Sequence, residues 1–209
     1  MFYFSSDDIE IAGASPETLV KLENGVLHTF PLAGTRPRGN TDEEDLALEK
    51  ELLADEKELA EHNMLVDLGR NDISKIGSVE VEKYMNIERY SHVMHIGSTV
   101  RGIIRDDKDA LDAVDSIFPA GTLSGAPKLR ACELICELEN NKRGIYGGAI
   151  GNLDTCIAIR LAFAKNGKVF VRSGAGIVAD SIPENEYQEC INKAKAVMNA
   201  LDMAKGGLE

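Results

Sequence analysis

Leu19-Val-Lys-Leu-Glu-Asn-Gly-Val-Leu-His-Thr-Phe30 is the stretch of sequence that decides the fold. Residues 19–23 and 26–30 carry strand-forming side chains on both sides of the dipeptide Asn24-Gly25. Asn-Gly between two such runs is typical of the two-residue turn of a β-hairpin. Because a two-residue turn joins antiparallel strands, this stretch predicts an antiparallel sheet.

A second hairpin is predicted farther along the chain, around Asn166-Gly167. Its expected strands cover residues 155–164 and 168–178, so that one strand runs without a break through Arg160. In that register Arg160 shares a strand face with small side chains. A lone arginine in such surroundings usually marks a cleft, and its guanidinium can bind a carboxylate through two hydrogen bonds.

Helices alternate with these strands. Thr41 and Glu44 form a capping pattern that opens one long helix, whose apolar periodicity continues to Leu68. The other expected elements are helices over 109–118, 126–139 and 183–204 and strands over 79–84 and 92–101. Helices mixed with antiparallel hairpins indicate the α+β class.

Composition limits the possible functions. The chain has 209 residues and a formal net charge of −12. We expect one domain over residues 1–209, and no nonspecific nucleic-acid binding, because an acidic chain repels phosphates. No apolar run approaches the roughly 18 residues of a membrane helix, and no secretion signal is visible. The expected location is therefore the cytoplasm, where the four cysteines stay reduced.

Two expected helices carry carboxylates at helical spacing. Glu58 and Glu61 are three residues apart, as are Glu186 and Glu189, and Lys193 follows Glu189 by four. Such spacing places each set on one helix face. Facing one another across a cavity, these carboxylates would suit Mg²⁺, which binds one or two carboxylates plus substrate oxygens. The alternative is that they are solvated surface charges.

A histidine and three glycine-rich loops add further candidates. His95 lies beside Gly97 on the small-residue face of an expected strand, where it suits acid–base catalysis or a purely structural role. The loops cover residues 33–35, 121–125 and 173–176. They favour an anion held by backbone N–H groups, or are simply tight turns. Arg172 joins Arg160 and Lys193 as a possible partner for a carboxylate substrate.

Eight motifs resemble the chorismate-utilising enzymes, and within them the branch that forms anthranilate. They follow one another in the order PLAGTRPRG from residue 31, ELAEHNMLVDLGRND from 58, ERYSHVMHIGSTVRG from 88, FPAGTLSGAPKLRACELI from 118, YGGAIG from 146, LDTCIAIR from 153, SGAGIVADS from 173 and ENEYQECINKA from 184. The resemblance covers nearly the whole chain. It implies antiparallel sheets packed as a sandwich, with the helices outside.

The resemblance also implies a reaction. Chorismate and ammonia would give anthranilate and pyruvate with the help of Mg²⁺, in tryptophan biosynthesis. A glutamine amidotransferase subunit, component II, would supply ammonia from glutamine. By motif position, Glu61 and Glu189 would be the Mg²⁺ ligands, and Glu58 and Glu186 would line the same site.

Roles in substrate binding and catalysis follow from the same resemblance. His95 would act as a general acid or base, and Thr122 would hydrogen-bond near the departing hydroxyl. The remaining implied chorismate contacts are Gly34, Thr35, Tyr146, Arg160, Gly174, Ala175, Gly176 and Lys193.

One residue separates the branches of the family. Relatives that form isochorismate or aminodeoxychorismate carry a lysine where this chain has Ala33. An alanine is neither nucleophile nor base, so the nucleophile must be delivered, as ammonia is in anthranilate formation. Two alternatives remain: component I of an aminodeoxychorismate synthase in the folate pathway, and an inactive fragment that binds only Mg²⁺ or a partner.

The chain departs from the family pattern in two places. Compared with the family, it is expected to lack an N-terminal regulatory region and the first part of the catalytic domain. The stretch from Tyr146 to Gly151 also runs directly into residues 152–155, where relatives have a longer connection. The placement of Tyr146 depends on this shortened loop.

Overall fold

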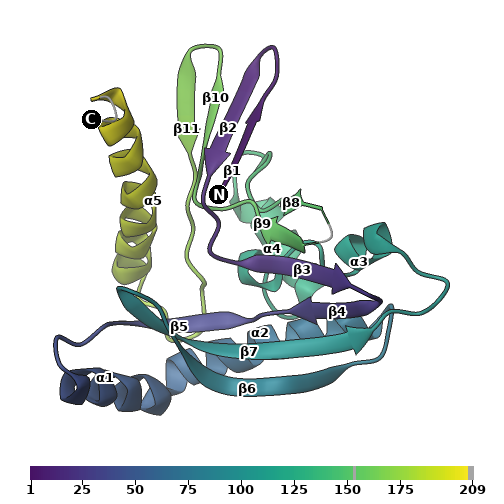
Figure 1. Ribbon diagram of the computed structural model, residues 1–209. Coiled ribbons are helices and arrows are strands. Elements are labelled where there is room, and N and C mark those ends of the chain that lie inside the picture. Colours follow the sequence, from purple (N-terminus) through teal and green to yellow (C-terminus); the bar gives the residue numbers. More distant parts are fainter. Residues whose placement is uncertain (153, 207–209) are drawn as a thin grey trace.

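The computed structural model describes residues 1–152 and 154–206 (Figure 1). The strands are β1 (Phe2–Ser5), β2 (Ile9–Gly13), β3 (Thr18–Glu23), β4 (Val26–Thr29), β5 (Leu32–Pro37), β6 (Glu80–Arg89), β7 (Val93–Ile103), β8 (Ala149–Gly151), β9 (Asp154–Ile157), β10 (Leu161–Lys165) and β11 (Lys168–Val171). The helices are α1 (Asp42–Ala54), α2 (Glu56–Ser74), α3 (Ala110–Ile117), α4 (Lys128–Leu138) and α5 (Pro183–Lys205), with a short 3₁₀ turn, η1 (Gly121–Leu123).

The strands form two antiparallel sheets. The larger has the order β5-β7-β4-β3-β9-β8, with β6 also paired to β7. The smaller has the order β1-β2-β10-β11 and stands upright beside α5 (Figure 1). Helices α1 and α2 pack against the larger sheet. The predicted α+β class is confirmed, and no helix of the described residues is long and apolar enough to cross a membrane.

The Asn24-Gly25 hairpin forms as predicted. β3 and β4 pair antiparallel, with Glu23 opposite Val26. Asn24 and Gly25 have φ angles of 51° and 77°. A two-residue hairpin turn needs two such left-handed residues, which asparagine and glycine tolerate best.

The second hairpin is shorter than predicted. β10 and β11 pair around Asn166-Gly167, but the expected strand over 155–164 is broken. Its first part, β9, joins the larger sheet and its second part, β10, joins the smaller one. Arg160 lies at this corner with a φ of 51°. The prediction of a continuous strand through Arg160 is wrong, because the chain changes sheets there.

The predicted long helix is two helices. α1 ends and α2 begins at Asp55, whose Oδ1 accepts hydrogen bonds from the backbone N–H groups of Lys57 (3.1 Å) and Glu58 (3.2 Å). The other carboxylate oxygen accepts from Arg36 at 2.9 Å. A capping carboxylate satisfies N–H groups that a helix start leaves free, so Asp55 starts a new helix in a new direction.

Strand β7 pairs with three strands of the larger sheet, β4, β5 and β6. Met94, Ile96 and Val100 are fully buried on the predicted apolar face, where Leu52 of α1 packs against Met94 and Ile96. His95 is on the opposite face and is half-buried. The predicted alternation of the two faces is confirmed, and it presents His95 away from the core.

Candidate active site

Helix α2 presents its two predicted carboxylates to glycines of other segments. A Cβ placed on Gly34, which has a φ of +71°, would lie 3.3 Å from Glu58 Oε2. A Cβ on Gly176 would lie only 2.9 Å from Glu61 Oε1. Glycine at both positions lets the backbone of β5 and of the segment before α5 approach these carboxylates closely.

Helix α5 brings the second set. Glu186 is buried, and its Oε1 lies 3.3 Å from Lys57 Nζ of α2. The Ser181 hydroxyl and the Lys57 ammonium hold the pKa of Glu186 below its usual value. One turn later, Glu189 forms an ion pair with Lys193. The Lys57–Glu186 pair therefore ties α5 to α2 at the predicted metal site.

The electrostatics show that the carboxylates of the two helices are close. Burial raises the pKa of Glu61, and the negative charges of Glu58 and Glu189 raise it further. The charges of Lys193 and Lys57 act in the opposite direction. Glu61 is therefore destabilised as an anion, and a cation placed beside it would relieve this repulsion.

These carboxylates suit a hard cation that takes only one or two of its ligands from the protein. Within residues 1–152 and 154–206, no three side chains of His, Cys, Asp or Glu are grouped tightly enough to enclose a metal by themselves. Mg²⁺ does not need such a cage, because it is usually held by one or two carboxylates together with waters and substrate oxygens. Glu61 and Glu189 would fit that mode of binding.

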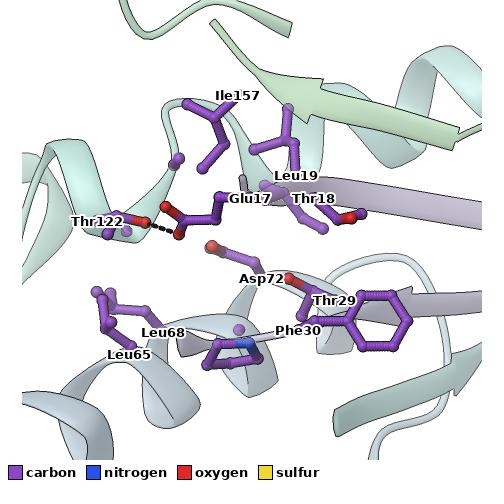
Figure 2. Close-up of a pocket in the computed structure, with 15 residues that line it drawn as sticks. Glu17, Thr18, Leu19, Thr29, Phe30, Leu65, Leu68, Asp72, Thr122 and Ile157 are labelled. Atoms are coloured by element: carbon purple, nitrogen blue, oxygen red, sulfur yellow. Dashed lines mark hydrogen bonds between the residues drawn. The ribbon is translucent and has the colours of Figure 1, made fainter. Parts of the chain in front are cut away.

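A carboxylate that the sequence analysis missed lies beside Thr122. Glu17 is in the connection between β2 and β3, and its Oε1 accepts a hydrogen bond from the Thr122 hydroxyl (Figure 2). Burial raises the pKa of Glu17, although the Thr122 hydroxyl and the charges of Lys193 and Arg160 partly oppose this shift. Glu17 thus interacts with three residues that the sequence analysis had singled out separately: Thr122 of η1, Lys193 of α5 and Arg160 at the β9–β10 corner.

A pocket opens next to this pair. It is a small hollow, with a cavity volume of about 30 Å³. Glu17 and Thr122 face each other across its upper part in Figure 2, and Leu65, Leu68 and Asp72 of α2 lie below them. The acid–hydroxyl pair thus lies on the wall of a small hollow that apolar side chains of α2 line on the other side.

His95 is oriented by the neighbouring strand β5. Its Nδ1 lies 2.9 Å from the carbonyl oxygen of Gly34 and 3.0 Å from the hydroxyl of Thr35. A carbonyl can only accept, so this contact places the proton of the neutral ring on Nδ1. Nε2 is then left as a proton acceptor. The edge of the Tyr90 ring also packs against His95, at 5.7 Å between centroids.

Tyr146 lies against the glycine segment that precedes α5. A Cβ on Gly174 would be 3.3 Å from the Tyr146 hydroxyl, and the carbonyl of Gly174 accepts a hydrogen bond from Lys193 at 3.2 Å. Burial raises the pKa of Tyr146. Ala175, from the same segment, lines a second hollow that Glu186 also borders. The connection after Gly151 includes Leu153, which lies outside the described residues.

Arg172 is placed differently from the sequence expectation. Its guanidinium donates to Glu139 (2.6 Å), Asn141 (2.8 Å) and the carbonyl of Lys142 (3.0 Å). These partners take both hydrogens of Nη1 and one of Nη2. Arg172 is therefore engaged within the protein, whereas the charges of Arg160 and Lys193 act on Glu17.

Residues 1–199 match the family model described as chorismate binding enzyme. The chain belongs to this family. Anthranilate synthase component 1 of Acetivibrio thermocellus is 61% identical over 213 residues, which cover 98% of the chain and 43% of that protein. The same component of Aquifex aeolicus (strain VF5) is 56% identical over 218 residues, which cover 100% of the chain and 44% of that protein.

A solved structure supports the same family assignment. Anthranilate synthase component I from Streptococcus pneumoniae TIGR4 superposes on the chain with a TM-score of 0.85 at 51% identity. The match covers 94% of the chain and 45% of that structure. This chorismate-binding enzyme chain thus spans less than half the length of these relatives.

Proposed function

We propose that the chain carries out the anthranilate synthase reaction, in which chorismate and ammonia give anthranilate, pyruvate and water. The observation that carries this proposal is the convergence of two groups of residues on Lys193. Lys193 forms an ion pair with Glu189, and its charge acts to lower the pKa of both Glu61 and Glu17, the partner of the Thr122 hydroxyl. Anthranilate synthase component 1 proteins are 54–61% identical over nearly the whole chain, which supports the same reaction.

Mg²⁺ would be held by Glu61 and Glu189, near Glu58 and Glu186. When bound, it neutralises a substrate carboxylate and withdraws electrons from the ring. Lys193, which is paired with Glu189, would add a second positive charge for the same carboxylate. This combination suits the ring carboxylate of chorismate.

Glu17 and Thr122 would act on the leaving hydroxyl. Expulsion of a hydroxyl as water requires a proton, and a carboxyl with a raised pKa keeps one at higher pH than an ordinary glutamate does. The Thr122 hydroxyl donates to Oε1 of Glu17, which leaves Oε2 to hold that proton. We assign Glu17 the role of general acid.

His95 would act as the base for the ring proton. Its Nδ1–H is held by the Gly34 carbonyl, so Nε2 is the atom that can accept a proton. Loss of the ring proton accompanies the elimination of pyruvate, which makes the ring aromatic. Arg160 and Tyr146 would hold the enolpyruvyl carboxylate during this step.

The nucleophile would come from outside the chain. Ala33 is buried in a cluster with Leu65 and Leu68, so no side chain at this position can attack the ring or activate water. Ammonia would enter free or from a glutamine amidotransferase subunit, component II. We place the reaction in the cytoplasm, because the four cysteines are free thiols.

The test is direct. The purified chain is mixed with chorismate, Mg²⁺ and excess ammonium at mildly alkaline pH, and anthranilate fluorescence is followed. A Mg²⁺-dependent signal supports the proposal. Aminodeoxychorismate found by chromatography would instead favour the folate-pathway reaction. Thermal stabilisation by chorismate and Mg²⁺ without any product would favour a fragment that only binds.

A further inference from the structure

Glu139, at the end of α4, has a half-buried carboxylate that binds two arginines, Arg143 and Arg172. The carboxylate of Glu139 accepts hydrogen bonds from Nε of Arg143 (3.1 Å to both oxygens) and from its Nη2 (2.7 Å). Arg172 donates to the same carboxylate from its Nη2, at 2.6 Å. The Arg143 hydrogen bond holds the pKa of Glu139 below its usual value. Both arginines are thus tied to this one carboxylate.

Arg172 connects Glu139 to Tyr146. The guanidinium carbon of Arg172 lies 5.6 Å from the centroid of the Tyr146 ring. Its other amino group is fixed by Asn141 Oδ1 and the carbonyl of Lys142. A guanidinium held at both ends forms a rigid plane against an aromatic face. The orientation of Tyr146 thus depends on Arg172, and that of Arg172 on Glu139.

Arg143 connects Glu139 to the turn that carries Thr122. Nη1 of Arg143 donates a hydrogen bond to the carbonyl of Leu123, the residue that follows Thr122 in η1. A Cβ on Gly147 would lie 2.8 Å from Leu123 Cδ1, so the segment after Tyr146 also packs closely against this turn. Arg143 therefore fixes the turn whose hydroxyl is hydrogen-bonded to Glu17.

We propose that Glu139 is a positioning residue that holds Tyr146 and the Thr122 turn in their working orientation. The inference rests on the proposed function, in which these two residues contact chorismate. The contacts through the two arginines should affect different kinetic constants. Arg172 orients Tyr146, which supports substrate binding and therefore KM. Arg143 orients Thr122 and its partner Glu17, which supports departure of the hydroxyl and therefore kcat. Residues that orient metal ligands in this way cost about 10- to 100-fold when replaced, and we expect an effect at the lower end of that range here.

The test compares Glu139→Gln with Glu133→Gln. Glu133 is on the same helix, and its pair with Arg130 is exposed, so the control removes an equal charge without touching the contacts of Glu139. We expect Glu139→Gln to lower kcat/KM about tenfold and Glu133→Gln to leave it unchanged. Arg172→Lys should mainly raise KM, and Arg143→Lys should mainly lower kcat. Equal kcat/KM in the two Gln variants would overturn the proposal.

A spectroscopic arm separates this proposal from the proposed function. The chain has five tyrosines and no tryptophan, so labelling with 3-fluorotyrosine gives few ¹⁹F NMR signals, and Tyr146→Phe identifies that of Tyr146. Glu139→Gln should shift this signal, and Glu133→Gln should not. An inactive wild-type chain would refute the function, while an unshifted signal would refute the positioning. If Glu139→Gln does not fold, Arg172→Lys provides the same spectroscopic test, because it leaves the Glu139–Arg143 contact in place.

Discussion

The two sides of the candidate site are built in different ways. The carboxylate side consists of Glu58 and Glu61 on α2 with Glu186 and Glu189 on α5, so regular helices fix each pair. The side around Glu17 consists of connections: the β2–β3 link, η1, the loop before β8 and the β9–β10 corner. The first side is set by helical spacing, and the second by how distant segments meet.

This difference predicts how each side tolerates change. A helix keeps its remaining carboxylate in place when the other is replaced, so substitutions on the carboxylate side should remove one chemical function each. The Glu17 side is held by single contacts such as the Thr122–Glu17 hydrogen bond. Substitutions there should change chemistry and stability together.

The largest effect is expected on the carboxylate side. Glu61→Gln or Glu189→Gln should lower Mg²⁺-dependent anthranilate formation by more than about 100-fold, since each removes a proposed Mg²⁺ ligand. Initial rates over a range of Mg²⁺ concentrations and calorimetric Mg²⁺ titration measure this loss. Glu184→Gln, an exposed residue of the same helix α5, is the matched control. Full activity in Glu61→Gln would remove Glu61 from the ligand set.

The next effect tests Glu17. Glu17→Gln should lower kcat by about 100-fold or more, because the amide cannot give up a proton to the leaving hydroxyl. Activity of the wild-type chain should also fall as pH rises through the raised pKa of Glu17, and the variant should lack this decline. A pH profile of kcat/KM checks both. An unchanged profile in the variant would assign the proton to another group.

Stability should respond to the same substitution with the opposite sign. With its pKa raised, folded Glu17 binds more protons than the unfolded chain at pH values above the ordinary glutamate pKa. The free energy of unfolding therefore falls as pH rises through this interval. Glu17→Gln avoids that loss, so its Tm should exceed that of the wild type by a margin that grows with pH. A constant difference between the two Tm values would contradict the shifted pKa.

The sequence shows that the four glutamates are placed in pairs on helix faces but gives no sign of Glu17, for physical reasons. Helical spacing and hairpin dipeptides are local signals, so the i, i+3 glutamates, both Asn-Gly turns and the face of His95 could be found from short stretches. Glu17 follows Pro16 in an unremarkable connection, and only the fold brings it to Thr122, 105 positions later. A buried glutamate also leaves no trace in a composition or a periodicity.

Two boundaries were missed for a related reason. Asp55 fits the polar face of a continuous helix, and only its contact with Arg36 shows why it caps α2 instead. The break at Arg160 arises because the chain pairs with a different sheet on each side of it. Ile157 pairs with Ala149 of β8 in the larger sheet, and Leu161 pairs with Gly13 of β2 in the smaller one. Such competition is settled by long-range pairing and has no local pattern.

A smaller effect than those of Glu61 and Glu17 is expected at Arg160. Arg160→Ala should raise KM for chorismate by roughly 10- to 100-fold, the size of a lost charge-assisted hydrogen bond of about 1.5–3 kcal/mol. The value of kcat should change less, because the carboxylate is bound both before and during the reaction. Steady-state kinetics over a wide range of chorismate concentrations measure the two constants. An unaltered KM would place Arg160 outside the substrate site.

The smallest expected effect is a difference in stability between two variants of Arg160, which distinguishes the role of its guanidinium from that of its left-handed backbone. At a φ of +51°, any residue with a Cβ is strained by about 1–2 kcal/mol, and glycine is not. Arg160→Gly and Arg160→Ala both lose the guanidinium, so their KM values should agree. Their stabilities should differ, because only alanine keeps the strain: the glycine variant should unfold about 2–8 °C higher. Thermal unfolding followed by circular dichroism measures this difference. If alanine is equally stable, the corner between the sheets relaxes when the arginine is removed, and the left-handed turn is imposed by the side chain rather than by the meeting of β9 and β10.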